Sequence, residues 1–243
     1  MNIRSMIETS GMLRGISRRT FVGGILSGCV FCSGGVALAK PQPPRFCAVD
    51  RNALKWLRPR SSTGNAQLDR VLIAELRNII RVIPVKPGFR IVDDFQGPNA
   101  FATSESLVHD TKGTALFGIN LIRTELRHKN GGYAVAGIAA HECAHIFQFL
   151  SRYFGVLTHG QPTAKRLELH ADLLAGYYLA KDKASEINLE AFARSLFEKG
   201  DYAFNDRNHH GTPDERVSAM ERGYALAREP FHRVAELGIR HVL

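Results

Sequence analysis

The sequence predicts a mostly helical α+β protein with a small β-sheet beside one apolar helix. Apolar residues recur at helical spacing over residues 66–82, and two later stretches, 133–150 and 162–176, are apolar nearly all round. Three short segments have the composition of strands: 89–95, 99–102 and 114–119. Long helices with so few strands favour helices packed around a small sheet.

The remaining elements follow from turn and capping residues. Residues 40–64 hold four Pro and the single Trp, and we expect an irregular segment there. Pro84 ends the first helix, and Asn120 is expected to cap a short helix over residues 121–126. The next helix is expected to begin near Tyr133, after the turn at 129–132.

The C-terminal third is expected to be helical. Pro162 fits the start of a helix, and another helix is expected from about Leu189 to Lys199. Thr212 is a good N-cap, with Pro213 at the first helical position and Glu215 in place for a capping box. At most a pair of helices is expected beyond, to the C-terminus.

Residues 1–39 have the pattern of an export signal. Residues 17–22 contain a twin-arginine pair, an apolar run continues to Ala39, and residues 37–39 are small as at a cleavage site. Cleavage would leave 204 residues, with one domain over 65–243, in the periplasm or another extracytoplasmic compartment. Two alternatives stay open: an uncleaved membrane anchor, or lipidation at Cys29.

The charge and the cysteines give weaker predictions. The formal net charge of +9 falls to +6 without the signal, and no Lys/Arg run exceeds two residues. This pattern predicts a solvated basic surface and no nucleic-acid interface. Cys47 and Cys143 would remain, and either a disulfide between them or a buried free thiol at Cys143 fits an exported protein.

The apolar helix carries a metal-binding pattern. Residues turn by about 100° each, which places His141 and His145 about 40° apart on one face, where both can reach one Zn²⁺. Glu142 flanks that face, where a base could take a proton from water on the metal. Cys143 points to the opposite side. Two His and a Glu in so apolar a helix would be costly to bury without a shared ion.

The third ligand is expected on the following helix. Catalytic zinc commonly keeps three protein ligands and an open position. Glu168, Asp172 and Gly176 share one helical face, so Glu168 can ligate while Asp172 accepts the second ring N–H of a ligating histidine. His170 is the competing ligand, but it points about 160° away from Asp172. A purely structural pairing of the two carboxylates with Arg or Lys remains the alternative.

Together these motifs resemble those of gluzincin zinc peptidases. Residues 140–148 read A-H-E-x-x-H-x-x-Q, residues 168–176 read E-L-x-A-D-x-x-A-G, and residues 210–216 read H-G-T-P-x-x-R. The combination, over roughly residues 90–225, looks like the bacterial neutral zinc metallopeptidases. It is also similar to soluble relatives of the prenyl-protein and HtpX-type peptidases, although this sequence has no membrane span after residue 39.

The resemblance implies a zincin-like catalytic domain and two further site features. His210 would lie near the metal cleft, where it could donate to a developing oxyanion; a simple loop histidine is the alternative. Arg216 could position His210 or pair with an acid. The segment Asn99, Ala100, Phe101 and Ala102 would form the edge strand of the cleft, against which an extended peptide could add a strand.

These observations predict a zinc-dependent endopeptidase of the cell envelope. One Zn²⁺ per chain would be held by His141, His145 and Glu168, with Glu142 as general base and a peptide or protein as substrate. The alternative is a zinc-containing envelope binding or chaperone-like protein whose peptidase site is unused. The intact Glu142 argues against that alternative.

Overall fold

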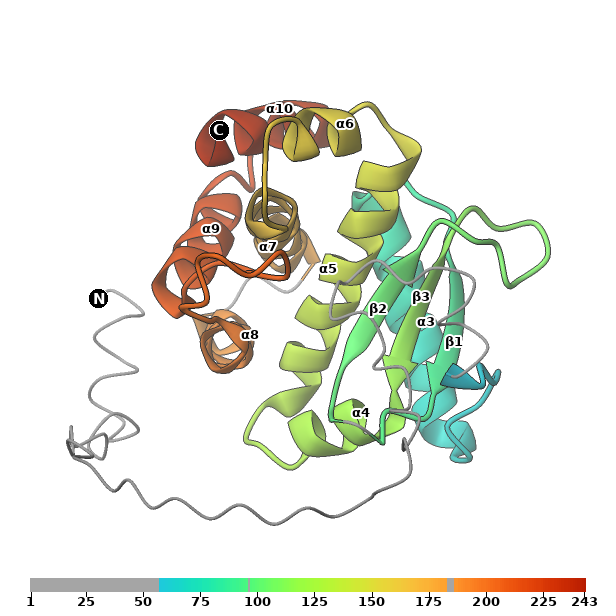
Figure 1. Ribbon diagram of the computed structural model, residues 1–243. Coiled ribbons are helices and arrows are strands. Elements are labelled where there is room, and N and C mark those ends of the chain that lie inside the picture. Colours follow the sequence, from blue (N-terminus) through green and yellow to red (C-terminus); the bar gives the residue numbers. More distant parts are fainter. Residues whose placement is uncertain (1–56, 96, 183–185) are drawn as a thin grey trace, which may run out of the picture. The chain divides into compact units, whose positions relative to one another are not determined.

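The computed structural model describes residues 57–95, 97–182 and 186–243, which are the coloured parts of Figure 1. All of them belong to one structural unit, Pro44–Leu243. The expected export signal (1–39), Cys29, Cys47 and most of the irregular segment 40–64 lie outside the described residues. No helix within the described ranges combines the length and the apolar character needed to cross a membrane.

The described residues confirm the α+β class, with a small sheet and a majority of helix. The sheet has the strands β1 (Gly88–Val92), β2 (Ala100–Thr103) and β3 (Thr114–Gly118), in the order β1-β3-β2. β1 runs parallel to β3, and β2 runs antiparallel to it. Every residue of β2 and β3 is buried. These two strands are therefore part of the core rather than a solvated face.

Most of the helices lie to one side of this sheet (Figure 1). They are α3 (Ala66–Val82), α4 (Ile119–Leu126), α5 (Gly131–Leu150), α6 (Tyr153–Thr158), α7 (Lys165–Asp182), α8 (Glu186–Lys199), α9 (Pro213–Ala225) and α10 (Phe231–Val242). The bounds of α3 are those predicted, because its apolar periodicity is clear and the side chain of Asn65 caps its first turn. Thr212 and Glu215 form the predicted capping box of α9.

Helix α5 lies between the sheet and the helices α7, α8 and α9, as Figure 1 shows. It packs on β2 and β3 and also on α7 and α8. This explains why its sequence is apolar nearly all round, since each face meets another element. Gly137 permits the approach of α8: a Cβ atom there would lie 2.4 Å from the ring of Phe192.

Helices α7 and α9 approach each other closely through two glycines. A Cβ atom at Gly176 would lie 2.0 Å from the carbonyl oxygen of Met220, and one at Gly223 would lie 1.7 Å from that of Leu173. Any side chain at either position would force the backbones apart. This close packing brings the first turn of α9, including Arg216, over the middle of α7.

Two local predictions were wrong, and one short helix was not predicted. Asn120 does not cap α4; the N-cap is Gly118, and the carboxylate of Asp94 instead accepts the backbone N–H groups of Asn120 and Leu121. The long helix after Pro162 begins only at Lys165. Helix α6 was not predicted, because its six residues are too few to show a helical period.

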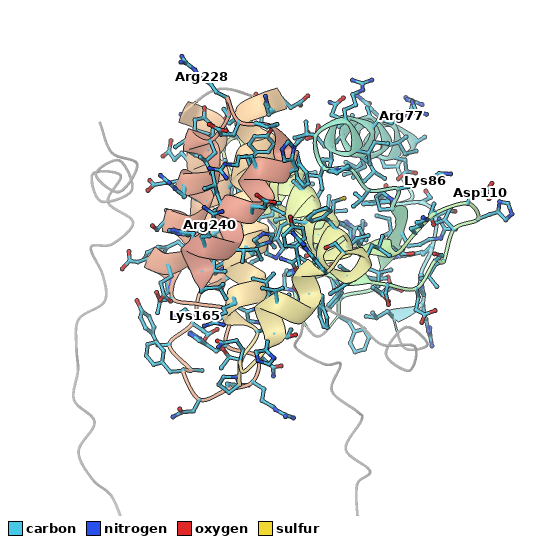
Figure 2. The ribbon with its side chains drawn as sticks, turned by 90° about the horizontal axis from the view of Figure 1, so that it is seen from above. Arg77, Lys86, Asp110, Lys165, Arg228 and Arg240 are labelled. Carbon is cyan, nitrogen blue, oxygen red and sulfur yellow. The ribbon has the colours of Figure 1, made fainter. Side chains whose placement is uncertain are left out.

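The basic side chains are spread over separate elements. Figure 2 labels Arg77 on α3, Lys86 before β1, Arg228 after α9 and Arg240 on α10, all of them exposed. They project outward from different parts of the surface rather than from one face. This distribution agrees with the even spacing of positive charge along the sequence.

Candidate metal centre

The structure brings the three predicted ligands together inside the protein. His141 and His145 project from α5 and Glu168 from the first turn of α7, and their ligand atoms all lie within 4.8 Å of one another. Glu168 is 1% exposed and His141 5%. The cluster could therefore hold a metal ion, and the identity of that ion remains a prediction.

The distances between ligand atoms suit a small tetrahedral ion. The two histidine Nε2 atoms are 3.0 Å apart, and each lies 3.4 Å from one oxygen of Glu168. Bonds of 2.0–2.1 Å at a tetrahedral zinc would place neighbouring ligands about 3.3 Å apart. The donor set of two imidazoles and a carboxylate is also one that zinc uses.

His141 is oriented by a charged pair behind it. Its Nδ1 lies 2.8 Å from Asp172 Oδ1, and Arg216 binds the same carboxylate through two hydrogen bonds of 2.8 and 2.9 Å. Burial alone would raise the pKa of Asp172, but Arg216 and then His141 lower it below its usual value. Asp172 is thus an ionised acceptor, so His141 carries its ring proton on Nδ1 and presents Nε2 to the cluster.

His145 is oriented by a neutral partner. Its Nδ1 lies 2.8 Å from Oε1 of Gln148, one turn further along α5. The amide nitrogen of Gln148 faces the carbonyl oxygen of Leu167 at 2.9 Å, so the amide oxygen is the atom that accepts from His145. Both histidines therefore direct the lone pair of Nε2 at the same point.

A proton or a metal ion would relieve the repulsion at that point. Two nitrogen lone pairs 3.0 Å apart repel each other and face a carboxylate as well, unless a proton or a metal ion lies between them. In the protein without metal, burial opposes protonation of His141, but Asp172 and Glu168 raise its pKa to about 10. A bound metal ion would take the place of that proton.

The ionised carboxylates of the centre outnumber its permanent cations. Glu168 and Asp172 have lowered pKa values, and Arg216 is the one arginine that faces both of them. Glu142 adds a further negative charge only when it loses its proton, which its raised pKa opposes. With neutral histidines, a bound cation would balance this excess of negative charge, which fits the donor set.

Glu142 is a buried carboxyl group in the same part of α5 as the two histidines. It is 2% exposed, and its Oε2 has no hydrogen-bond partner among the described residues. Burial, partly offset by His141, raises its pKa to about 8. An acceptor buried without a partner is costly, and a proton held near neutral pH is what a general base requires.

His210 reaches the centre from the loop between α8 and α9. Its Nδ1 lies 3.2 Å from Oε2 of Glu168, and its side chain is 21% exposed. Burial would lower its pKa, but the carboxylate of Glu168 raises it. His210 therefore lies at the solvent-facing side of the ligand cluster. The proposed oxyanion role stays a prediction.

The loop that carries His210 is held by Asp201. That carboxylate accepts the backbone N–H of His210 at 3.0 Å and lies 2.5 Å from Nδ1 of the buried His209. Arg216 pairs with an acid, which is one of the two options that the sequence offered. It also faces the same oxygen of Glu168 as His210 does.

His170 is absent from the ligand cluster, as its helical direction predicted. Its Nδ1 lies 3.0 Å from the amide nitrogen of Gln148, and its Nε2 lies 3.1 Å from the carbonyl oxygen of Ala235. Burial lowers its pKa to about 4, so the ring is neutral. The contact between Gln148 and His170 was not anticipated. The sequence feature that could have indicated a role for Gln148 is its position one helical turn after His145.

The structure also describes two other features of the sequence analysis, the expected edge strand and Cys143. Residues Ala100–Thr103 form β2, at one end of the strand order and next to α5, with Asn99 just before it. Cys143 is a buried free thiol on α5, and burial raises its pKa well above the usual value.

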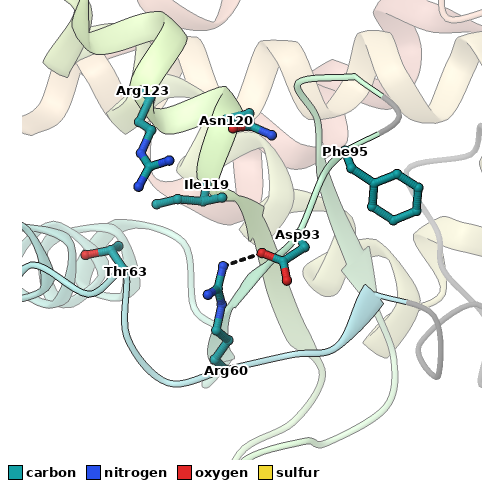
Figure 3. A pocket seen from close by; sticks show the side chains of 7 residues that line it. All are labelled: Arg60, Thr63, Asp93, Phe95, Ile119, Asn120 and Arg123. Carbon is teal, nitrogen blue, oxygen red and sulfur yellow. Dashed lines mark hydrogen bonds and ion pairs between the residues drawn. The ribbon is translucent and has the colours of Figure 1, made fainter.

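A separate surface cavity of about 490 Å³ contains none of the predicted site residues. Figure 3 shows it between the loop before α3, the end of β1 and the start of α4, with Arg60 paired to Asp93. Arg123 and Phe95 also line it. Because the Arg60 charge is already balanced by Asp93, the cavity offers a weaker case for a charged ligand than the buried cluster does.

Comparisons of the chain with protein-family models, with curated proteins and with solved structures found no match. The interpretation of the metal centre therefore depends on its own geometry and on the motifs that form it.

Proposed function

We propose that this protein is a zinc-dependent peptidase, and that His141, His145 and Glu168 hold one zinc ion per chain. The observation that carries the proposal is the buried oxygen of Glu142, which has no hydrogen-bond partner among the residues that the structure describes. A centre that served only to hold a metal would have no use for a third acidic group of this kind beside Glu168 and Asp172.

In the proposed reaction, the zinc ion and the protein side chains have separate roles. Zinc, when bound, supplies a Lewis acid that polarises a carbonyl and makes water a better nucleophile at neutral pH. Glu142 takes a proton from the attacking water and returns it to the leaving amine. His210, at the open side of the cluster, donates a hydrogen bond to the carbonyl oxygen as negative charge develops there.

The substrate in this proposal is an extended peptide. β2 lies at the end of the sheet beside α5, where a peptide could add to the sheet by backbone hydrogen bonds. The export-signal pattern of residues 1–39 supports a reaction in the cell envelope. The resemblance of the three motifs to gluzincin peptidases supports the same reaction.

The alternative is a protein that binds metal without catalysis, and the low exposure of the ligands favours it. Structural zinc sites are closed by protein, whereas catalytic sites keep a position for water or substrate. The two proposals differ in what Glu142 does, because only a peptidase needs it to move a proton.

Glu142→Gln separates these proposals. We expect the variant to keep about one zinc per chain by elemental analysis and to lose casein hydrolysis by a factor on the order of 10²–10⁴. Wild-type hydrolysis should stop with 1,10-phenanthroline and return with zinc. Glu198→Gln, at a half-exposed position on α8, is the matched control and should match wild type. Hydrolysis by Glu142→Gln at the wild-type rate would remove the proposed base, and wild-type protein without chelator-sensitive hydrolysis would favour the binding protein.

A further inference from the structure

A line of buried side chains connects the second histidine of the metal centre to the C-terminal helix. His145 contacts Gln148, Gln148 contacts His170, and His170 contacts the backbone of Ala235 on α10. The successive distances are 2.8, 3.0 and 3.1 Å. All three side chains are buried.

The carbonyl of Ala235 determines where the proton of His170 lies. A carbonyl oxygen only accepts hydrogen bonds, so Nε2 of His170 must donate to it. Nδ1 of His170 faces the amide nitrogen of Gln148, which only donates. Nδ1 must therefore accept, and His170 is held as the neutral tautomer with its proton on Nε2.

The amide of Gln148 then has one possible orientation. Its nitrogen donates one hydrogen to His170 and the other to the carbonyl oxygen of Leu167, which uses both of its protons. Its oxygen is left to accept from Nδ1 of His145. A reversed amide would place its oxygen against the carbonyl of Leu167.

The packing around His170 keeps this arrangement in place. Tyr153 stacks on its ring with centroids 5.8 Å apart. On α10, a Cβ atom at position 238 would lie 2.8 Å from Cδ2 of the ring, so Gly238 is what permits α10 to come close enough for Ala235 to accept the hydrogen bond.

We propose that Gln148 and His170 are positioning residues: they hold His145 with its proton on Nδ1 and its Nε2 lone pair free for the metal, and α10 anchors them through Ala235. The inference rests on the metal centre of the proposed function, but not on its peptidase activity. The two histidines are thus oriented by different contacts. The ionic pair of Asp172 and Arg216 orients His141. A neutral chain of Gln148, His170 and the carbonyl of Ala235, which we call the relay, orients His145.

The relay predicts a specific loss when either link is removed. Outer contacts that orient metal ligands commonly contribute 10–100-fold to metal affinity. We expect Gln148→Met, which keeps the length of the side chain, to weaken zinc binding within that range. His170→Phe keeps the stacking partner of Tyr153 but breaks the second link. It should have a smaller effect, about threefold to tenfold, because Leu167 still holds the amide.

The experiment measures zinc affinity by competition with a chromophoric chelator, together with the histidine tautomers by ¹⁵N NMR of the full chain. Gln67→Met, at an exposed position of α3, is the matched control and should leave both unchanged. Wild-type His170 should show its proton on Nε2 even without metal, and His145 should show its proton on Nδ1 in the zinc form. In Gln148→Met, the Nδ1–H signal of His145 should lose its protection from exchange with water.

The outcomes distinguish the relay from the function. A His170 proton on Nδ1 in wild type, or zinc affinity within threefold of wild type in a folded Gln148→Met, would overturn the relay. The tautomer of His170 in metal-free wild type needs no variant and no zinc, so it tests the relay even where Gln148→Met does not fold. Absence of peptidase activity with these NMR results intact would reject the proposed reaction and leave the relay standing.

Discussion

Two buried acidic centres in this protein are balanced in different ways. Glu125 on α4, 2% exposed, accepts hydrogen bonds from Ser195, Lys199 and Arg194, all on α8. Glu168 on α7 instead faces three histidines, with Arg216 at 3.6 Å and committed mainly to Asp172. Glu125 has two permanent cations to itself, whereas Glu168 shares its one arginine with Asp172 and otherwise faces histidines.

This difference shows how to tell a structural acid from a ligand. A buried carboxylate that joins two helices needs a cation of its own, and Glu125 has two. A buried carboxylate among imidazoles is balanced either by protons on those rings or by an ion from outside the chain. The two centres should therefore respond differently to mutation. Substitution of Glu125 should lower the stability of the fold, and substitution of Glu168 should lower the affinity for metal.

The largest expected effect is on metal affinity in Glu168→Ala. The variant removes one of three ligands, so we expect zinc affinity to fall by more than the 10–100-fold typical of an outer contact such as Asp172. Equilibrium competition with a chelator measures the loss. His170→Ala is the comparison, because His170 contacts Gln148 rather than the cluster, and its loss should be tenfold or less. A larger loss in His170→Ala than in Glu168→Ala would mean that the wrong face of α7 was chosen.

His210→Ala extends the comparison to the loop above Glu168. If His210 donates to the oxyanion, kcat and kcat/KM should fall together by about 10²–10³ with zinc content unchanged. A change within a fewfold would make it a loop histidine, and a fall in zinc content would make it a ligand. Exposed His232 on α10 is the control. His209 is unsuitable, because it is buried against Asp201, which also holds the backbone of His210.

The smallest expected effect is on stability in Glu125→Gln. Removing this charge leaves Lys199 and Arg194 without their buried partner, which should lower the free energy of unfolding by about 2–4 kcal/mol at pH 7, measured by urea denaturation. Zinc content should not change. A variant as stable as wild type would mean that the ionic cluster contributes nothing, and a loss of zinc would mean that the two centres are coupled.

The same variant has a predictable pH dependence. Burial would raise the pKa of Glu125, but Lys199, Ser195 and Arg194 lower it below the usual 4.5. A lowered pKa stabilises the folded state above the unfolded value and ceases to do so as the pH falls through the folded value. The difference between wild type and Glu125→Gln should therefore be full above about pH 5.5 and shrink below pH 4.5. A difference that stays constant with pH would contradict the ionic explanation.

The sequence was most informative where side chains that can bind a metal recur at helical spacing. His141, His145, Glu168 and Asp172 could be assigned to faces because each pair lies on one helix at a spacing of four residues. The bounds of α3 and the capping box of α9 followed from local patterns for the same reason.

The sequence was least informative about contacts between distant elements. Arg216 reaches Asp172 from 44 residues away, and His170 reaches Ala235 from 65 residues away, so no local pattern indicates either pair. The cap of α4 by Asp94 was missed in the same way, since the carboxylate lies 26 residues before the N–H group of Asn120. Glu125 meets Ser195 from 70 residues away, so nothing in its local sequence distinguishes it from a surface acid.

The burial of α5 on every side has a consequence for how the chain folds. This helix has too little polar surface to be stable alone in water, so we expect it to form together with the sheet and α7 rather than before them. The three ligands come together only when α5 and α7 pack, late in that process. A metal ion should therefore do little to speed folding and should act mainly by slowing unfolding.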